Sequence, residues 1–176
     1  MRIISGIHKG RNIVAPSNLP ARPTTDYAKE GLFNILNNRI DFTSVKLLDL
    51  FGGIGSISFE FASRECKSIT YVDSHFGCFN FVKNKAKELK LDTIKTLKVN
   101  VFAYLKNCVE KFDVIFADPP FEMRETAKIP EIVFSNNYLT EDGILIIEHD
   151  QSHDFENTER FLEVRKYGKV HFSIFK

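Results

Sequence analysis

A regular alternation of strand and helix patterns between residues 45 and 148 constrains the fold of this chain more than any other feature. Apolar runs typical of buried strands occur at residues 45–50, 68–73, 94–99, 112–117 and 143–148. Helical patterns lie between them, at residues 56–64, 77–89, 101–107 and 127–135. Strands that are apolar along their whole length predict a parallel sheet covered by helices on both faces.

The two ends of the chain follow other patterns. Extended runs at residues 161–167 and 169–175, joined at Gly168, predict an antiparallel C-terminal hairpin. Residues 1–14 contain two short extended pieces around Gly6 and Gly10, which predict a short N-terminal β-hairpin, and residues 15–23 form a proline-rich connector. A helix begins near Asp26, after a capping threonine, and ends around residues 37–38.

Together these patterns predict an α/β fold with a doubly wound, seven-stranded, mostly parallel sheet in residues 24–176, and an N-terminal extension and linker in residues 1–23. A parallel sheet that closes on an antiparallel hairpin is the Rossmann-like layout of class I S-adenosylmethionine-dependent methyltransferases. A length of 176 residues suits a single domain, and 43% apolar residues, including 17 phenylalanines, suffice for a full core.

Charge and cysteine content narrow the possible classes of protein. A net charge of +1 gives the whole chain no nucleic-acid signature, yet residues 1–40 carry six basic and two acidic side chains. That segment fits a phosphate-contacting face and equally fits a solvated one. Three cysteines without C-x-x-C spacing, and five histidines without ligand spacing, suggest neither a disulfide framework nor a metal site. Without a transmembrane-length run or a signal-peptide region, the sequence predicts a cytoplasmic protein with no membrane partner.

A glycine-rich turn follows the first predicted strand. In an open α/β sheet, this turn is where a ligand meets the carboxyl edge, and the next helix offers free N–H groups to it. The candidate cofactor ligands in and before the turn are Asp49, Phe51, Gly52, Gly53 and Gly55. A dehydrogenase is disfavoured, because Ser58 stands where its fingerprint has a third glycine.

Two further strand ends complete the predicted cofactor site. Asp73, eighteen residues after Gly55, ends the second strand, where a carboxylate accepts hydrogen bonds from the hydroxyls of an adenosine ribose. Helix capping is the competing role for Asp73. Asn100 and Val101 follow the third strand, near the place where an adenine ring lies in this topology.

The fourth predicted strand ends in Asp118-Pro119-Pro120-Phe121. Two prolines stop both a ladder and a helix, and they donate no hydrogen bond. The Asp118 carboxylate and the Pro119 carbonyl therefore offer acceptors beside an aromatic ring, which suits the exocyclic amine of a nucleobase. Taken alone, these four residues also fit a plain strand exit with a capping Asp. The glycine turn and Asp73, at neighbouring strand ends, favour the catalytic interpretation.

The chain resembles class I methyltransferases of exocyclic amines and, within them, the RsmD family of 16S ribosomal RNA guanine-N2 methyltransferases. The resemblance spans nearly the whole chain: residues 2–6 and 9–11, the glycine turn, D-P-P-F, Glu148 and Tyr167-Gly168 all match. Its most family-specific part is R-P-T-T-D at residues 22–26, which continues at residues 29–34. Two departures are Gly53, where alanine is usual, and Asn100, where aspartate is commoner.

This resemblance implies S-adenosylmethionine as the cofactor and 16S ribosomal RNA, free or in a partly assembled small subunit, as the substrate of a monomeric enzyme. The methylated base would be guanine 966 in the usual numbering of that RNA. Thr24 and Thr25 would hold the carboxylate of the cofactor, with helix capping as the competing role. Glu148 would contact the base or serve a structural role. The residues expected to contact RNA phosphates are Lys9, Arg11 and Arg22.

The implied chemistry is an in-line methyl transfer that needs no metal. Asp118 and the Pro119 carbonyl would accept hydrogen bonds from the guanine amine and stabilise the positive charge that develops on it. Pro120 would keep this turn rigid, and Phe121 would stack on the target base once it leaves its neighbours. The methylated amine would then lose a proton to solvent or to Asp118.

Two alternative functions stay open at this point. A DNA or other RNA amino-methyltransferase acting on adenine N6 or cytosine N4 needs the same acceptors. Such DNA enzymes usually carry a sizeable target-recognition region, and no insertion in this chain exceeds a short loop. A catalytically silent RNA-binding module of the same fold is the other alternative. The intact D-P-P-F and the glycine turn argue against it.

Overall fold

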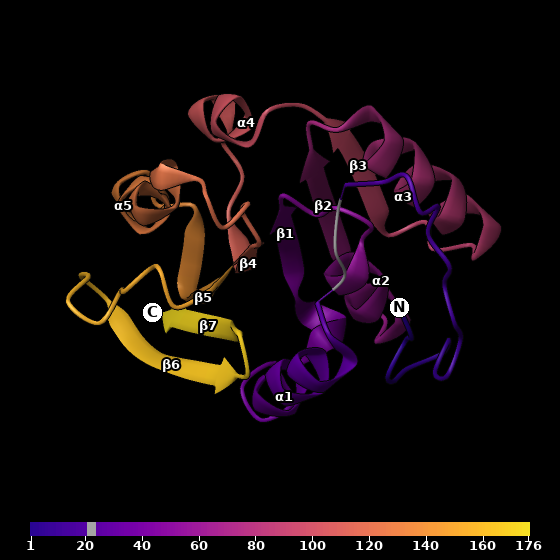
Figure 1. The fold of residues 1–176 in the computed structure, drawn as a ribbon, viewed down its shortest axis with the longest axis horizontal. Coiled ribbons are helices and arrows are strands. Elements are labelled where there is room, and N and C mark those ends of the chain that lie inside the picture. The colour runs from indigo at the N-terminus through magenta and orange to yellow at the C-terminus, as the bar shows by residue number, and fades with distance from the viewer. Residues whose placement is uncertain (21–23) are drawn as a thin grey trace.

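The computed structural model describes residues 1–20 and 24–176 and contains one seven-stranded sheet in the order β3-β2-β1-β4-β5-β7-β6 (Figure 1). Strands β1 to β5 run parallel, while β7 is antiparallel to both of its neighbours. The predicted α/β fold, with a parallel sheet and an antiparallel C-terminal hairpin, is therefore confirmed. The strands are β1 (Lys46–Leu50), β2 (Ser68–Asp73), β3 (Ile94–Lys98), β4 (Phe112–Ala117), β5 (Leu139–His149), β6 (Phe161–Tyr167) and β7 (Val170–Phe175).

Helices cover both faces of this sheet, because the strands bury side chains on each side. Val114 and Phe116 of β4 pack into one core with the first three helices, while Ile115 and Ala117 pack into a second core with the other two. The helices are α1 (Asp26–Leu36), α2 (Ser56–Ser63), α3 (Phe76–Glu88), α4 (Val101–Asn107) and α5 (Ile129–Ser135), with 3₁₀ turns η1 (Phe42–Ser44) and η2 (Arg124–Lys128).

Strand β5 differs from its prediction, because it begins at Leu139 rather than at residue 143. The intervening Thr-Glu-Asp segment has the composition of a loop. Leu139 nevertheless pairs with Phe112, and a register shift between Phe112 and Val114 absorbs the irregularity. The hydroxyl of Thr140 also donates to a carboxylate oxygen of Asp113, at 2.8 Å. Tertiary pairing thus extends this strand beyond its apolar stretch.

Residues 1–13, which we call the N-terminal arm, form a loop closed by a single antiparallel bridge between Arg2 and Asn12, where the sequence predicted a β-hairpin. The arm lies against α1 and α2. The buried carboxylate of Glu60 accepts hydrogen bonds from the backbone N–H groups of Ile4 and Ser5, at 2.8 and 3.0 Å. The backbone N–H of Ile7 donates to the Ser63 carbonyl, at 2.7 Å. The arm is thus bonded to α2 through main-chain groups.

A buried lysine joins the arm to both helices. Lys29 of α1 is 1% exposed, and its Nζ donates to the Arg2 carbonyl at 2.6 Å and lies 3.8 Å from the Glu60 carboxylate. Burial lowers the pKa of Lys29, and the negative charge of Glu60 opposes that shift. Removing one partner of such a pair would leave an uncompensated buried charge. The arm is therefore part of the packed fold.

The C-terminal hairpin lies beside α1 in Figure 1, and one glycine permits that contact. A Cβ added at Gly31 would lie 2.1 Å from the ring of Tyr167. Tyr167 also meets Tyr27 edge-on, with 5.5 Å between the ring centroids. Along the described ranges of the chain, no helix is both long and apolar enough to cross a membrane.

Candidate active site

Four acidic side chains follow or end neighbouring strands at the carboxyl edge of the sheet. Asp49 lies in β1, Asp73 ends β2, Asp118 follows β4, and Glu148 is the penultimate residue of β5. The pairing of Ala117 with Ile147 brings Asp118 and Glu148 to adjacent positions across β4 and β5. The parallel topology therefore collects these carboxylates at the edge where ligands bind in open α/β sheets.

The glycine turn is fixed by hydrogen bonds to its own backbone. Asp73 accepts from the N–H of Gly53 at 2.8 Å and from the N–H of His75 at 2.7 Å. The Tyr71 hydroxyl donates to the Gly53 carbonyl at 2.7 Å. A Cβ at Gly52 would lie 2.4 Å from the Tyr71 ring, so this position requires glycine. Asp73 is half-buried and already holds the turn, a capping-like role that the sequence had weighed against ribose binding.

Other parts of the turn have strained or enclosed backbone. Phe51 adopts a φ of 57° and Gly55 a φ of 78°, both in the left-handed region that favours glycine. A Cβ at Gly55 would lie 2.9 Å from the side chains of Phe59 and Val82. Strain of this kind at a strand end is typical of ligand sites.

Asp49 lies beneath the turn and is 1% exposed. Both the N–H and the hydroxyl of Ser58 donate to its carboxylate, at 3.2 and 2.5 Å. Burial raises the pKa of Asp49 to about 7, although the bonds from Ser58 oppose the shift. In the sequence, Ser58 served only as an argument against a dehydrogenase. In the structure it is the residue that donates both hydrogen bonds to the Asp49 carboxylate.

The Asp118 side chain is partly buried, and its carboxylate has no hydrogen-bond donor among the residues that the structure describes. Its backbone N–H donates to the Leu50 carbonyl at 3.2 Å, which fixes the start of the D-P-P-F turn. No hydrogen bond reaches its carboxylate from any residue that the structure describes. Burial, and then the negative charges of Glu148 and Asp49, raise the pKa of Asp118 well above its usual range. A carboxylate held in this way is available to a ligand that brings its own donors.

Glu148 is 4% exposed and receives one hydrogen bond from the described part of the chain, from the hydroxyl of Thr24 at 2.8 Å. Burial raises the pKa of Glu148 to about 7, and the bond from Thr24 opposes the shift. This contact joins the residue before the α1 cap to the end of β5. The sequence identified both residues but gave no signal that they touch.

Two of the remaining candidate residues, Thr25 and Asn100, cap helices. Thr25 accepts a hydrogen bond from the Ala28 N–H at 3.2 Å and caps α1. Asn100 accepts from two N–H groups, at 3.0 and 3.1 Å, and caps α4. Val101 is 2% exposed. In the D-P-P-F turn, Pro119 is buried, Pro120 is exposed and Phe121 is 42% exposed.

The predicted phosphate contacts lie apart from this edge. Lys9 and Arg11 are exposed on the N-terminal arm, whose tip packs against the C-terminal end of α2. The eight residues of α2 separate that end from the glycine turn by about 12 Å at 1.5 Å per residue. Arg22 lies outside the described residues.

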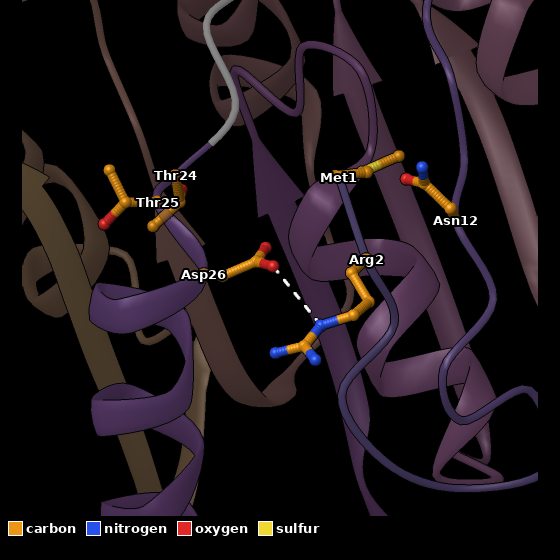
Figure 2. Close-up of a pocket in the computed structure, with 6 residues that line it drawn as sticks. All are labelled: Met1, Arg2, Asn12, Thr24, Thr25 and Asp26. Atoms are coloured by element: carbon orange, nitrogen blue, oxygen red, sulfur yellow. Dashed lines mark ion pairs between the residues drawn. The ribbon is translucent and has the colours of Figure 1, made fainter.

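A pocket of about 510 Å³ opens between the N-terminal arm and the start of α1 (Figure 2). Arg2 and Asp26 point toward each other across it, with 3.3 Å between the guanidinium Nε and the carboxylate. The pocket meets the candidate site at Thr24 and Thr25, and none of its lining residues comes from the glycine turn. Within residues 1–20 and 24–176, no cluster of three or more metal-ligating side chains occurs.

The model of the family described as "Conserved hypothetical protein 95", which is that of the RsmD family, matches residues 1–176. The chain belongs to this family. A Bacillus subtilis relative named "Putative rRNA methyltransferase YlbH" is 31% identical over 100% of this chain and 98% of its own length. The Haemophilus influenzae protein named "Ribosomal RNA small subunit methyltransferase D" is 29% identical over 100% of this chain and 93% of its own.

Solved structures share the fold of this RsmD-family chain. The "Putative methyltransferase yhhF" of Escherichia coli has a TM-score of 0.87 at 21% identity, covering 99% of this chain and 96% of its own. The structure titled "Crystal structure of SMU.776, a putative methyltransferase complexed with SAH" has a TM-score of 0.62 at 16% identity, covering 80% and 48%. Both likenesses concern the fold.

Proposed function

We propose that the protein transfers a methyl group from S-adenosylmethionine to N2 of a guanine in 16S ribosomal RNA, at the position numbered 966. One observation carries the choice of an exocyclic amine as acceptor. The Asp118 carboxylate is held half-buried at the carboxyl edge and receives no hydrogen bond from the described chain. An amine supplies the donors that this acceptor lacks.

S-adenosylmethionine is the cofactor of this methyltransferase, and the residues at the sheet edge fit it. Asp73 stands beside the glycine turn, where a ribose hydroxyl would share its carboxylate with the Gly53 and His75 N–H groups. Asn100 stands at the next strand end, toward the adenine. Asp49 and the pair Thr24 and Thr25 are assigned to the charged methionine end of the cofactor.

The cofactor supplies an electrophilic methyl group, so the task of the protein is alignment and charge stabilisation. Asp118 and the Pro119 carbonyl accept hydrogen bonds from the guanine amine, which favours a pyramidal nitrogen with an available lone pair. As the new bond forms, the negative charge of Asp118 stabilises the positive charge on that nitrogen. The raised pKa of Asp118 then makes it a suitable acceptor for the proton that the methylated amine releases.

Phe121 is assigned to stacking on the extruded base, since its ring is 42% exposed beside these acceptors. Lys9 and Arg11 are assigned to phosphates of the same RNA. Their exposed position near the C-terminal end of α2 suits contacts to flanking nucleotides rather than to the target itself. The names of the relatives support ribosomal RNA as the substrate.

Substitutions at Asp118 test this function in single-turnover methyl transfer to an RNA fragment that contains the target guanine. We expect Asp118→Ala to lower the rate by roughly a hundredfold to a thousandfold, because an electrostatic contact in the transition state is lost. Asp118→Asn keeps an oxygen acceptor without its charge, so its rate should lie above that of Asp118→Ala. Both variants should keep the wild-type dissociation constant for S-adenosylmethionine in calorimetry.

Two controls make the result specific. Asp73→Ala should weaken cofactor binding, because a charged hydrogen bond to ribose is worth about 1.5–3 kcal/mol. Phe121→Tyr should be tolerated, whereas Phe121→Ala should impair placement of the base. A wild-type rate for Asp118→Ala would reduce D-P-P-F to a strand exit. Methylation of adenine or cytosine in place of guanine would favour the other amino-methyltransferase functions.

A further inference from the structure

Glu148 is a second carboxylate beside Asp118, and methyl transfer to an amine does not by itself require it. The two residues occupy adjacent positions at the ends of β4 and β5, after the paired residues Ala117 and Ile147. Glu148 is 4% exposed, and within the described ranges its side chain has one hydrogen-bond partner, Thr24. Two neighbouring acids, one buried and one half-buried, are costly for a fold, since the charge of each disfavours ionisation of the other.

A ligand with two adjacent donors would offset this cost. The Watson–Crick edge of guanine carries such a pair, because its N1–H lies next to its N2 amine. Adenine and cytosine differ, because each carries a ring-nitrogen acceptor beside its amine. The ring nitrogen next to the amine on the Watson–Crick edge is therefore the atom that distinguishes the three candidate substrates, because it is a donor in guanine and an acceptor in adenine and cytosine.

We infer that the Glu148 carboxylate accepts a hydrogen bond from N1–H of the target guanine, and that this contact restricts methyl transfer to guanine. The inference rests on the proposed function, because it assumes that Asp118 holds the amine of the same base. Asp118 then accepts from N2 while Glu148 accepts from N1, so the two neighbouring acids match the two neighbouring donors. An adenine in the same position would set its N1 lone pair against the negative charge of Glu148.

Thr24 is the positioning residue for this contact. Its hydroxyl donates to Oε2 of Glu148 at 2.8 Å, which fixes the orientation of the carboxylate. Thr24 is itself 6% exposed and belongs to the R-P-T-T-D segment, just before the Thr25 cap. The most family-specific segment of the sequence therefore reaches the base through Glu148.

The test compares guanine with 2-aminopurine, which keeps the amine but has an unprotonated N1. Single-turnover methyl transfer is measured at pH 8.5, above the Glu148 pKa of about 7, on RNA fragments that differ only in the target base. We expect the wild-type enzyme to methylate guanine about tenfold to a hundredfold faster than 2-aminopurine, the range expected for one base contact. Equal rates on the two bases would overturn the inference without any variant.

The variant Glu148→Gln supplies the opposite hydrogen-bonding pattern. Its amide oxygen still accepts from Thr24, while its amide N–H groups donate to the bare N1 of 2-aminopurine. We expect the ratio of the guanine rate to the 2-aminopurine rate to fall by at least tenfold, with cofactor affinity unchanged. A variant that slows both bases equally would show a structural role for Glu148 and would also overturn the inference.

Glu141→Gln is the matched control, because it makes the same chemical change at an exposed position of β5. It should leave both rates and their ratio unchanged. Failure of the proposed function has a different signature, since a wild-type enzyme that methylates adenine or cytosine and leaves guanine untouched contradicts that function before Glu148 is considered.

Discussion

Three acidic residues stand out at the residue scale, because the fold shields their side chains from water at the carboxyl edge. The pKa values of Asp49, Asp118 and Glu148 are all raised, and burial is the first cause in each case. An interior built for stability alone would place apolar or amide side chains at such positions. Perturbed acids gathered in one place are typical of a site that binds a charged or hydrogen-bonding ligand.

Asp49 yields a prediction about stability and pH. The pKa of Asp49 in the folded protein is about 7, above the usual 3.8. Its contribution to the free energy of unfolding is therefore most favourable below pH 3.8 and is lost as the pH rises through about 7. Asp49→Asn removes this loss and keeps an oxygen acceptor for Ser58. We therefore compare the free energy of unfolding of the variant with that of the wild type. This difference should favour the variant more at pH 8 than at pH 5, by on the order of 2 kcal/mol. Urea unfolding of both proteins at the two pH values measures this difference.

The control for this experiment is Asp92→Asn, which changes an exposed carboxylate in the same way. Its unfolding is measured against the wild type at the same two pH values. If the difference in the free energy of unfolding between Asp49→Asn and the wild type were equal at pH 5 and pH 8, the raised pKa of Asp49 would be contradicted. Weaker binding of S-adenosylmethionine by this variant is expected alongside the gain in stability.

The positions of the glycine turn and of D-P-P-F at strand ends were predictable from the sequence, because an apolar strand and the glycines or prolines that end it are adjacent. The bonds that hold these turns come from other strands, as those from Tyr71 to Gly53 and from Asp118 to Leu50 show. The bond from Ser58 to Asp49 spans nine positions, and that from Thr24 to Glu148 spans 124. No local pattern reports such pairs, since each depends on how the strands and helices are packed.

At the scale of elements, the attachment of the N-terminal arm depends on one glycine. Gly6 adopts a φ of +82°, and a Cβ there would lie 1.8 Å from the Ser63 carbonyl oxygen. Gly10 adopts a similar φ of +81° with nothing within 4 Å. The two positions therefore share the same backbone strain and differ in close contact with α2.

Gly6→Ala should accordingly destabilise the protein more than Gly10→Ala does. Backbone strain alone costs about 1–2 kcal/mol at either position, and the clash with Ser63 adds about 1–3 kcal/mol at Gly6. Urea unfolding gives both values, and hydrogen exchange at the Ile7 amide reports whether the arm leaves α2. Equal losses for the two variants would show that the contact with Ser63 is not needed.

Elements with a strong apolar period were predicted well, and those made by tertiary contacts were not. The strands β1, β2 and β4 begin and end within a residue of their predicted bounds. The early start of β5 depends on pairing with β4, a segment distant in the sequence. The arm's single bridge is local, but contacts with α1 and α2 hold the arm in place. Lys29 and Glu60, which anchor the arm, look in the sequence like ordinary exposed helix residues.

At the scale of the whole molecule, a net charge of +1 means that the proposed RNA binding depends on local basic segments. The arm presents Lys9 and Arg11 to solvent, and it is rigidly held by α1 and α2. An arm held in this way keeps the two charges in a fixed position relative to the carboxyl edge, so the proposed phosphate contacts would position the RNA without ordering a loop.

Salt dependence tests this assignment. The double variant Lys9→Ala and Arg11→Ala should bind the RNA fragment more weakly and flatten the dependence of log affinity on log salt by about one unit per lost contact. Lys87→Ala with Lys106→Ala removes two exposed charges from other helices and is the matched control. A wild-type slope for the arm variant, or an equal change in the control, would assign the RNA to another surface.

The hydrogen bond between Thr24 and Glu148 also sets an order in time. During synthesis, Thr24 leaves the ribosome 124 residues before its partner, and β5 gains its antiparallel neighbour only with β7, where Glu148 pairs with Phe172. The glycine turn and Asp73 are complete long before that point. A growing chain would therefore complete the proposed cofactor side of the site first and the proposed base-contacting side last, when the final strand pairs with β5.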